Sequence, residues 1–201
     1  MIKLKTALSA LVFTTLLGIL GTTNSAAQEN QGNSTSQGKM NATLHTNMGN
    51  ILLQLDADRA PITVANFIQY ANTDFYNGTI FHRVIPRFMI QGGGFTPKLK
   101  QKKTANPIKN ESKNRWHNER GTIAMARTND PDSATAQFFI NVRMNSNLDY
   151  RYGRPGYTVF GKVISGLDIV DGIAMSPTQA TGPHQNVPLT PIIINSVSIG
   201  N

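Results

Sequence analysis

Two polar side chains interrupt an apolar segment, FHRVIPRFMIQGGG, that covers residues 81–94. Arg83 and Gln91 lie in a run that is otherwise typical of a buried strand. A guanidinium and a carboxamide are unfavourable there unless they face a cleft. Phe88 and Met89 lie between them and would supply an apolar surface. The segment therefore predicts a groove that binds an apolar group and acts on one polar bond within it.

Two further segments, GTIAMAR at residues 121–127 and QFFIN at residues 137–141, are strand-like. Because alternate side chains of a strand share a face, Gln137 and Phe139 should point one way and Phe138 the other, into the core.

The same alternation puts Met89 and Gln91 on one face. Phe88 can join them only through a bulge or twist just after Pro86.

The apolar pattern predicts a mainly β protein. Helices are expected at 61–72, where Pro61 suits a first turn, and at 166–173. Strands are expected at 42–46, 50–55, 79–84, 88–91, 122–126, 138–142, 158–163 and 192–199. About eight strands and two helices fit a closed antiparallel β-barrel capped by helices, with a sandwich as the alternative. Side chains fill so small a barrel, so a ligand would lie on its outer wall.

The first 40 residues are expected to lie outside the folded domain. Residues 1–27 have the features of a cleavable secretory signal: early lysines, an apolar run of about 14 residues and the small residues Ser25-Ala26-Ala27. A retained membrane anchor is the alternative, although the run is shorter than the roughly 20 residues of a span. Residues 28–40 are expected to be a flexible leader, and residues 41–201 one domain. These features predict export to a bacterial periplasm.

Composition excludes several chemistries. The chain has no cysteine, so it has no disulfide, thiol nucleophile or thiolate metal site. His45, His117 and His184 are too dispersed to predict a metal site. The residues around Asp130-Pro131-Asp132 do not have the spacing of a calcium loop. Gly92-Gly93-Gly94 lacks the partners of a phosphate loop, so it is expected to form a tight turn near the substrate.

The formal net charge is +8, and the strongest basic cluster is KLKQKK at residues 98–103, with Lys98, Lys100, Lys102 and Lys103. Few aromatic residues accompany these lysines, which argues against nucleic-acid binding. A solvated loop is expected, with weak attraction to anionic surfaces or partners as the alternative. Nothing resembles a dimer seam, so a monomer is expected.

The motifs FHRVIPRFMIQGGG, GTIAMAR, SATAQFFI and VFGKV, in this order, resemble the cyclophilin-type peptidyl-prolyl cis-trans isomerases, and in particular the secreted bacterial branch. The resemblance covers about residues 40–199. It implies an eight-stranded barrel capped by two helices, with a proline-binding groove on its surface.

The resemblance also implies roles for individual residues. Arg83 matches the family's catalytic arginine, and Gln91 the carboxamide beside it. The walls of the proline pocket match Phe88, Met89, Phe139 and Leu148. The edge that binds the substrate backbone matches Ala126, Arg127, Thr128 and Gln137.

Three positions depart from the familiar eukaryotic pattern. Asn147 replaces a tryptophan, Tyr157 a histidine and Arg87 a common glycine. Asn147 and Tyr157 are still expected to border the substrate. Since the tryptophan helps to bind cyclosporin, weaker cyclosporin binding is expected here.

The chemistry itself favours the same assignment. Rotation about a peptide bond has a barrier of roughly 18–20 kcal/mol because the nitrogen lone pair is delocalised. In the twisted state the nitrogen regains its lone pair, and a donor such as Arg83 would bind that state better than the planar one. Gln91 would aim the guanidinium. No nucleophile, metal or cofactor is called for, and His82 is expected to be a buried, hydrogen-bonded histidine because no proton is transferred.

Two functions remain open on the residues alone. The first is an isomerase that assists the folding of exported, proline-containing polypeptides. The second is a chaperone that binds such chains without catalysing rotation.

Overall fold

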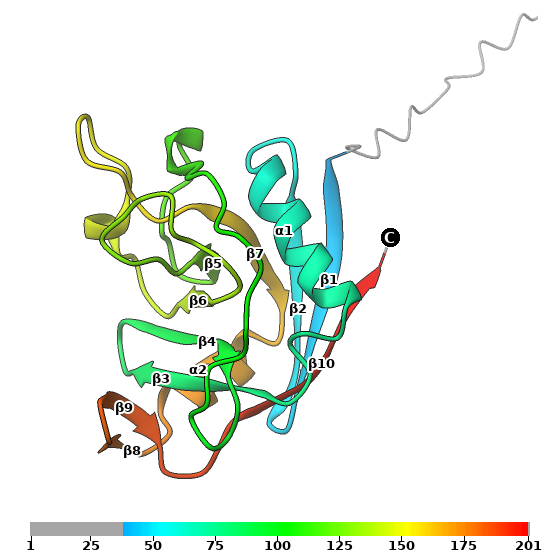
Figure 1. The fold of residues 1–201 in the computed structure, drawn as a ribbon, viewed down its shortest axis with the longest axis vertical. Helices are drawn as coiled ribbons and strands as arrows, with labels where there is room; N and C mark the ends of the chain where they lie inside the picture. Colours follow the sequence, from blue (N-terminus) through cyan, green and yellow to red (C-terminus); the bar gives the residue numbers. More distant parts are fainter. Residues whose placement is uncertain (1–37, 201) are drawn as a thin grey trace, which may run out of the picture. The chain divides into compact units, whose positions relative to one another are not determined.

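The computed structural model describes residues 38–200, which form a closed antiparallel β-barrel (Figure 1). The strands β1 (Lys39–Thr46), β10 (Ile193–Gly200), β3 (Thr79–Ile85), β4 (Met89–Phe95), β6 (Phe138–Asn141), β5 (Thr122–Met125), β7 (Val159–Ser165) and β2 (Gly49–Asp56) follow one another around the barrel in this order. The barrel prediction is confirmed. The expected signal and most of the expected leader lie outside the described residues, although β1 already begins at Lys39.

The two predicted helices are present as α1 (Pro61–Asn72) and α2 (Leu167–Ala174). Pro61 occupies the first turn of α1, and Val64, Phe67 and Ala71 are buried against the barrel. Ala60, at the start of α1, gives no side-chain cap. The carboxylate of Glu111 instead accepts hydrogen bonds from the backbone N–H groups of Ile62 and Thr63 at 3.0 and 2.8 Å. This contact ties the long segment before β5 to α1.

An aromatic cluster fills the barrel interior. Phe67 of α1 packs against Tyr76, Phe138 and Phe160 with ring-centroid distances of 5.2, 5.8 and 5.4 Å. The buried hydroxyl of Tyr76 donates to the carbonyl oxygen of Ala136 at 3.0 Å, and burial raises the pKa of Tyr76. With the interior filled, a ligand must bind on the outer wall.

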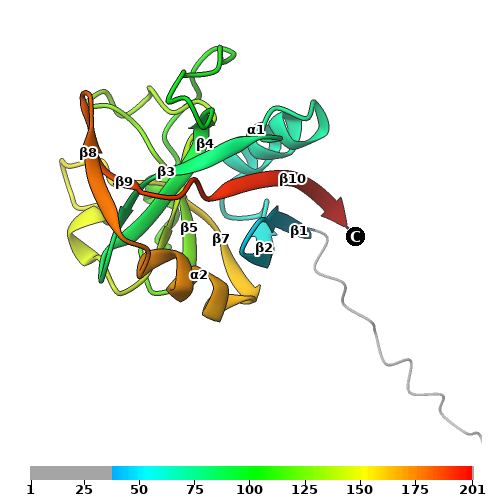
Figure 2. The same ribbon diagram turned by 90° about the horizontal axis from the view of Figure 1, so that it is seen from below.

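Four short elements were not predicted. The strands β8 (Thr178–Thr181) and β9 (His184–Pro188) form a hairpin beside β3 (Figure 2), and the 3₁₀ turns η1 (Ser112–Asn114) and η2 (Ser146–Leu148) lie in loops. Polar residues dominate β8, so it shows no apolar alternation.

The prediction of a tight turn at Gly92-Gly93-Gly94 is wrong, because all three glycines lie within β4. They are needed for close packing. A Cβ atom would lie 2.9 Å from the Phe81 ring at Gly92, 2.7 Å from the Phe138 ring at Gly93 and 2.4 Å from the Gln137 side chain at Gly94. Gly93 also has a φ of +79°, which favours glycine.

Candidate active site

Most of the candidate site residues named from the sequence line one groove on the outer wall of the barrel. The groove has a volume of 120 Å³. It crosses β3, β4, β6 and β5. Its lining consists of Arg83, Phe88, Met89, Gln91, Ala126, Arg127, Phe139, Leu148 and Tyr157. Residues separated by up to 74 positions in the chain therefore meet at one site because their strands are neighbours in the barrel.

The polar end of the groove is a row of three side chains. Arg83 and Gln91 are directly paired across β3 and β4, and Nη1 of Arg83 donates to Oε1 of Gln91 at 3.3 Å. Nε2 of Gln91 donates in turn to Oε1 of Gln137 at 3.0 Å. This row fixes the amide of Gln91, so that its oxygen faces the guanidinium.

The guanidinium of Arg83 carries an uncompensated charge. None of the ion pairs within residues 38–200 involves Arg83, which is half-buried beside the apolar floor. Of its five donors, one is used by Gln91. A structural salt bridge, the ordinary reason for an arginine inside a strand, does not explain its presence. The remaining donors can serve a ligand.

A separate apolar cluster forms the floor of the groove. Met89 and Phe139 are 2 and 4% exposed and rest on buried Ala124 and Val159. Tyr157 packs edge-on against Phe139 with a ring-centroid distance of 5.6 Å. Phe88 and Leu148 complete the walls. The result is a small apolar depression with a guanidinium at its rim, which suits a compact apolar ring attached to a polar bond.

Phe88 reaches the groove from a turn. The chain reverses between Ile85 and Met89, with the N–H of Phe88 donating to the carbonyl oxygen of Ile85 at 3.1 Å. Arg87 has a left-handed φ of +58°, a conformation that favours glycine. Strand alternation therefore does not apply to Phe88, which agrees with the expected irregularity after Pro86. The side chain of Arg87 is exposed and does not line the groove.

A second depression of 300 Å³ continues the groove past Gln91. Its lining includes Thr128 and Gln137, the two expected edge residues that do not line the groove. Ala126 and Arg127 line both depressions. The residues that the sequence assigned to the substrate backbone thus lie along one connected surface.

Asn147 differs from the other expected site residues. It lies in η2 with an exposed side chain and lines neither depression. Its carbonyl oxygen accepts a hydrogen bond from Nη2 of Arg154 at 2.6 Å. The structure therefore puts Asn147 beside Leu148 but outside the groove.

Arg127 uses its side chain to support the groove wall. Its guanidinium donates to the carbonyl oxygens of Pro155, Gly156 and Thr128 at 2.9, 3.2 and 2.8 Å. It also lies over the ring of Tyr157 at 4.5 Å. These contacts hold the segment that carries Tyr157 against the groove.

A buried amide network behind the groove was not predicted. Nδ2 of Asn145 donates to the carbonyl oxygen of Phe88 at 2.9 Å and to Oδ1 of Asn141 at 2.7 Å. Nδ2 of Asn141 donates to Oδ1 of Asn118 at 3.2 Å. The only sequence signal was an asparagine directly after the apolar strand FFI, which is costly to bury unless it is hydrogen-bonded.

Asp149 closes this network. Both the backbone N–H and the side chain of Asn118 donate to it, at 2.7 and 2.9 Å, and His117 contacts it at 2.9 Å. Burial by itself would raise the pKa of Asp149, but these hydrogen bonds outweigh burial and hold the pKa below its ordinary value. The network thereby joins the segment before β5 to the turn that carries Phe88.

His82 is 5% exposed, as expected for a buried histidine. Its Nδ1 atom has no hydrogen-bond partner among residues 38–200, which differs from the expectation. Burial, followed by the neighbouring His184, lowers the pKa of His82 to about 4. The ring is therefore neutral at neutral pH and packs against the rings of Phe95 and His184.

Within residues 38–200, no group of three histidine, aspartate or glutamate side chains is arranged to hold a metal ion. No helix in that range has the length and hydropathy needed to cross a membrane.

Known proteins are similar to this chain in sequence. Residues 41–199 match the family described as "Cyclophilin type peptidyl-prolyl cis-trans isomerase/CLD". The chain is 58% identical over 156 residues to a peptidyl-prolyl cis-trans isomerase of Acinetobacter baylyi, covering 78% of this chain and 83% of the relative. It is 53% identical over 161 residues to peptidyl-prolyl cis-trans isomerase B of Escherichia coli, covering 78% and 98% of the two chains.

A solved structure agrees with these matches. The crystal structure of a cyclophilin-type peptidyl-prolyl cis-trans isomerase of Cryptosporidium parvum, in the presence of the dipeptide Ala-Pro, is 26% identical with a TM-score of 0.70. The match covers 80% of this chain and 99% of that one. With its barrel and its motifs, the chain belongs to the cyclophilin-type peptidyl-prolyl cis-trans isomerases.

Proposed function

We propose that this isomerase rotates Xaa-Pro bonds of exported polypeptides by holding the twisted amide on Arg83. The observation that carries the proposal is the position of the Arg83 guanidinium, which lines the apolar groove and is hydrogen-bonded to Gln91 rather than paired with a carboxylate. Its charge is available to the substrate.

The proline ring of the substrate occupies the apolar floor formed by Met89 and Phe139, between Phe88 and Leu148. The crystal structure of a similar protein was determined in the presence of the dipeptide Ala-Pro, which supports a proline-containing ligand here. Holding the ring fixes one side of the Xaa-Pro bond, and the acyl side can then rotate relative to it. The connected depression with Thr128 and Gln137 takes the adjoining residues of the chain.

Arg83 acts on the nitrogen of that bond. In the planar amide the nitrogen is a poor acceptor, because its lone pair is delocalised. In the twisted state it becomes pyramidal and accepts a hydrogen bond from the guanidinium. An interaction made only in the transition state lowers the barrier, whereas one made equally in both states does not.

The required stabilisation is modest. Uncatalysed Xaa-Pro isomerisation takes tens to hundreds of seconds. A turnover of about 1–1,000 per second then requires roughly 3–7 kcal/mol of barrier lowering. A single preorganised donor removed from an enzyme site costs about 2.7–4 kcal/mol. Arg83 together with the apolar floor can supply the whole effect without proton transfer.

The substrates are exported polypeptides, since residues 1–27 have the composition of a secretory signal. The site of action is then the periplasm. Terminal sequencing of the protein from cell fractions tests this assignment. A periplasmic chain that starts just after Ala27 is expected, and a cytoplasmic chain that retains residues 1–27 would contradict export.

Cyclosporin binds weakly in this proposal, because Asn147 stands where the eukaryotic pattern has a tryptophan and its side chain lies outside the groove. Calorimetry with Asn147→Trp tests the point. At least tenfold tighter cyclosporin binding is expected, and unchanged affinity would contradict the role given to this position.

Exchange spectroscopy on a short Ala-Pro peptide tests the function. The wild type should accelerate cis-trans exchange, and Arg83→Ala should lose most of that acceleration while remaining folded. If the folded wild type binds the peptide without accelerating exchange, the protein is a proline-peptide-binding chaperone instead. If Arg83→Ala is as fast as the wild type, the proposed mechanism is wrong.

A further inference from the structure

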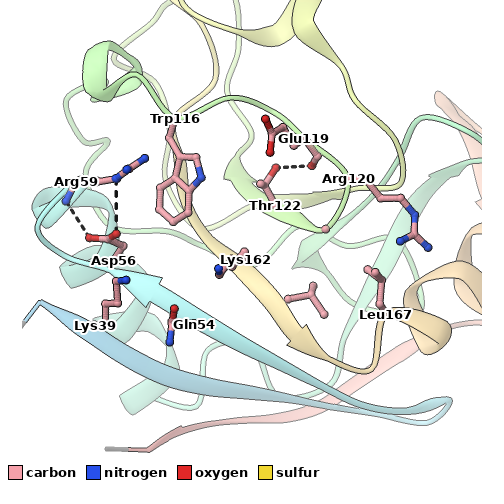
Figure 3. A pocket seen from close by; sticks show the side chains of 12 residues that line it. Lys39, Gln54, Asp56, Arg59, Trp116, Glu119, Arg120, Thr122, Lys162 and Leu167 are labelled. Atoms are coloured by element: carbon pink, nitrogen blue, oxygen red, sulfur yellow. Dashed lines mark hydrogen bonds and ion pairs between the residues drawn. The ribbon is translucent and has the colours of Figure 1, made fainter. Parts of the chain in front are cut away.

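A separate cavity lies elsewhere on the outer wall of the barrel. It shares no lining residue with the groove or with the second depression. Its volume of 320 Å³ falls within the range of roughly 300–1,000 Å³ that is usual for ligand sites. Strands β1, β2, β7 and β5 form its floor, and the segment that carries Trp116 and Glu119 forms a wall (Figure 3). This segment lies between the cavity and the groove, because Trp116 lines the cavity and also packs against the apolar cluster under the groove.

The floor is a row of polar side chains from neighbouring strands. Lys162 of β7 is directly paired with Gln54 of β2 on one side and with Thr122 of β5 on the other. Lys39 of β1 is paired with Asp56 of β2. Paired residues share one face of a sheet, so these side chains meet on the outer surface.

Positive charge dominates the cavity. Four cations line it, Lys39, Arg59, Arg120 and Lys162, against two acids, Asp56 and Glu119. Arg120 is paired with Asp171 at 2.5 Å, and Arg59 lies 3.8 Å from Asp56. None of the ion pairs within residues 38–200 involves Lys39 or Lys162. These two ammonium groups are available to an anionic ligand.

The cavity also offers apolar contact. The ring of Trp116 is half-buried on one wall, with the guanidinium of Arg59 5.1 Å from its centroid. Leu167 lies at the opposite end (Figure 3). Between them, the amide of Gln54 can both donate and accept hydrogen bonds.

We propose that this cavity binds an extended acidic segment of a polypeptide. The cations do not converge on one point: Figure 3 shows Lys39 and Lys162 at separate places on the floor, and Arg120 beyond them. Such spacing fits carboxylates carried by successive residues of a peptide. A compact phosphate would instead need donors that converge on one point. The amide of Gln54 serves the peptide backbone, and Trp116 packs against its aliphatic groups.

Calorimetric titration with an acetylated, amidated tetraglutamate peptide tests the proposal. The peptide contains no proline, so its binding does not depend on the proposed role of Arg83. Saturable binding is expected, with at least tenfold weaker affinity for tetraglutamine. Trp116 is the only tryptophan of the chain, so its fluorescence should change on titration with the same midpoint.

Lys162→Gln and Lys39→Gln should each weaken tetraglutamate binding at least fivefold. Lys98→Gln, which removes an equal and exposed charge from a different surface, should weaken it less than twofold. Circular dichroism establishes that each variant is folded, and two cavity variants are used so that the loss of one leaves the test intact.

Four results would overturn the proposal. They are no saturable binding of tetraglutamate, equal binding of tetraglutamine, equal weakening by Lys98→Gln and Lys162→Gln, and tighter binding of inorganic phosphate or of a single-stranded oligonucleotide than of tetraglutamate. Equal weakening would mean attraction to the net charge of the chain, and the last result would mean a different class of ligand.

Discussion

Arg83 donates from Nη1 to Oε1 of Gln91 at 3.3 Å, across two paired strands of the barrel. The distance is long for a hydrogen bond to a guanidinium. Gln91 therefore orients Arg83 without competing strongly for it. A carboxylate at this place would bind the guanidinium more tightly and compensate its charge. A neutral amide leaves the charge for the substrate.

This relationship predicts the effect of two changes at Gln91. Gln91→Glu should lower kcat by at least tenfold, because a carboxylate competes with the twisted amide for Arg83. Gln91→Ala should lower kcat less, by a few-fold, since the charge remains but its orientation is looser. Steady-state kinetics on an Ala-Pro peptide measures both. Gln179→Glu, at an exposed position of β8 that lines neither depression, serves as the control. Equal activity of Gln91→Glu and the wild type would contradict the account.

The amide network predicts a role for Asn145 at a distance from the substrate. Asn145→Ala removes a donor from the carbonyl oxygen of Phe88 and leaves Oδ1 of Asn141 without that partner. The free energy of unfolding should fall by about 1–3 kcal/mol, the cost of an unsatisfied buried polar group. KM should also rise, because the turn that carries Phe88 is less fixed.

Denaturant unfolding and steady-state kinetics on Asn145→Ala measure the two effects. Ser146→Ala, at the exposed adjacent position, should change neither. A stability loss with an unchanged KM would show that the network supports the fold but does not position Phe88.

The contacts of Arg127 predict that lysine cannot replace it. A lysine keeps the charge but lacks the planar fork that reaches three carbonyl oxygens. Arg127→Lys should raise KM about threefold to tenfold while kcat changes little, because Tyr157 is held less firmly. Arg115→Lys, at an exposed position, is the matched control. An unchanged KM in Arg127→Lys would show that the contacts of Arg127 do not support substrate binding in the groove.

The buried ring of His82 predicts a loss of stability in mild acid. Its pKa is about 4 in the fold, against 6.5 in the unfolded chain, so the unfolded chain binds more protons between these values. The free energy of unfolding should therefore be largest above pH 6.5 and fall by about 3 kcal/mol as the pH decreases to 4. Asp149, whose pKa is lowered from 3.8, adds its own loss only at still lower pH.

Urea unfolding at pH 7 and pH 4.5 measures this dependence. His82→Gln should lose much less stability between the two pH values than the wild type does. An equal loss in His82→Gln would assign the pH dependence to other groups.

Periodicity was enough to predict the strands of the barrel and both helices, because the buried strands and α1 carry apolar residues at regular spacing. It left a sandwich open as the alternative, and the resemblance of the motifs implied the barrel. Periodicity failed for β8 and β9, where polar residues form a hairpin whose contacts are supplied by β3. It also failed for Gly92-Gly93-Gly94. These glycines resemble a turn locally, but they lie in a strand because the side chains of Phe81, Phe138 and Gln137 occupy the space of their Cβ atoms.

The groove residues could be named from motifs, but their arrangement could not. Alternation correctly separated Phe138, in the barrel core, from Phe139, on the groove floor. It gave no information about Arg127, whose side chain supports Tyr157 through contacts made 28 and 29 residues away. The cavity beside Trp116 could not be predicted either, because its cations come from four separate segments that only the closed barrel brings together.

The most direct test of the account is to measure kcat and the substrate dissociation constant separately for Arg83→Ala and Arg83→Lys. Line-shape analysis of an Ala-Pro peptide provides both quantities. Since the guanidinium acts on the twisted state, Arg83→Ala should lower kcat by about 100- to 1,000-fold while the dissociation constant changes less than threefold. Arg83→Lys should recover only part of kcat. If Arg83→Ala weakens binding by the same factor as it lowers kcat/KM, with kcat unchanged, then Arg83 binds the planar substrate and the proposed mechanism is contradicted.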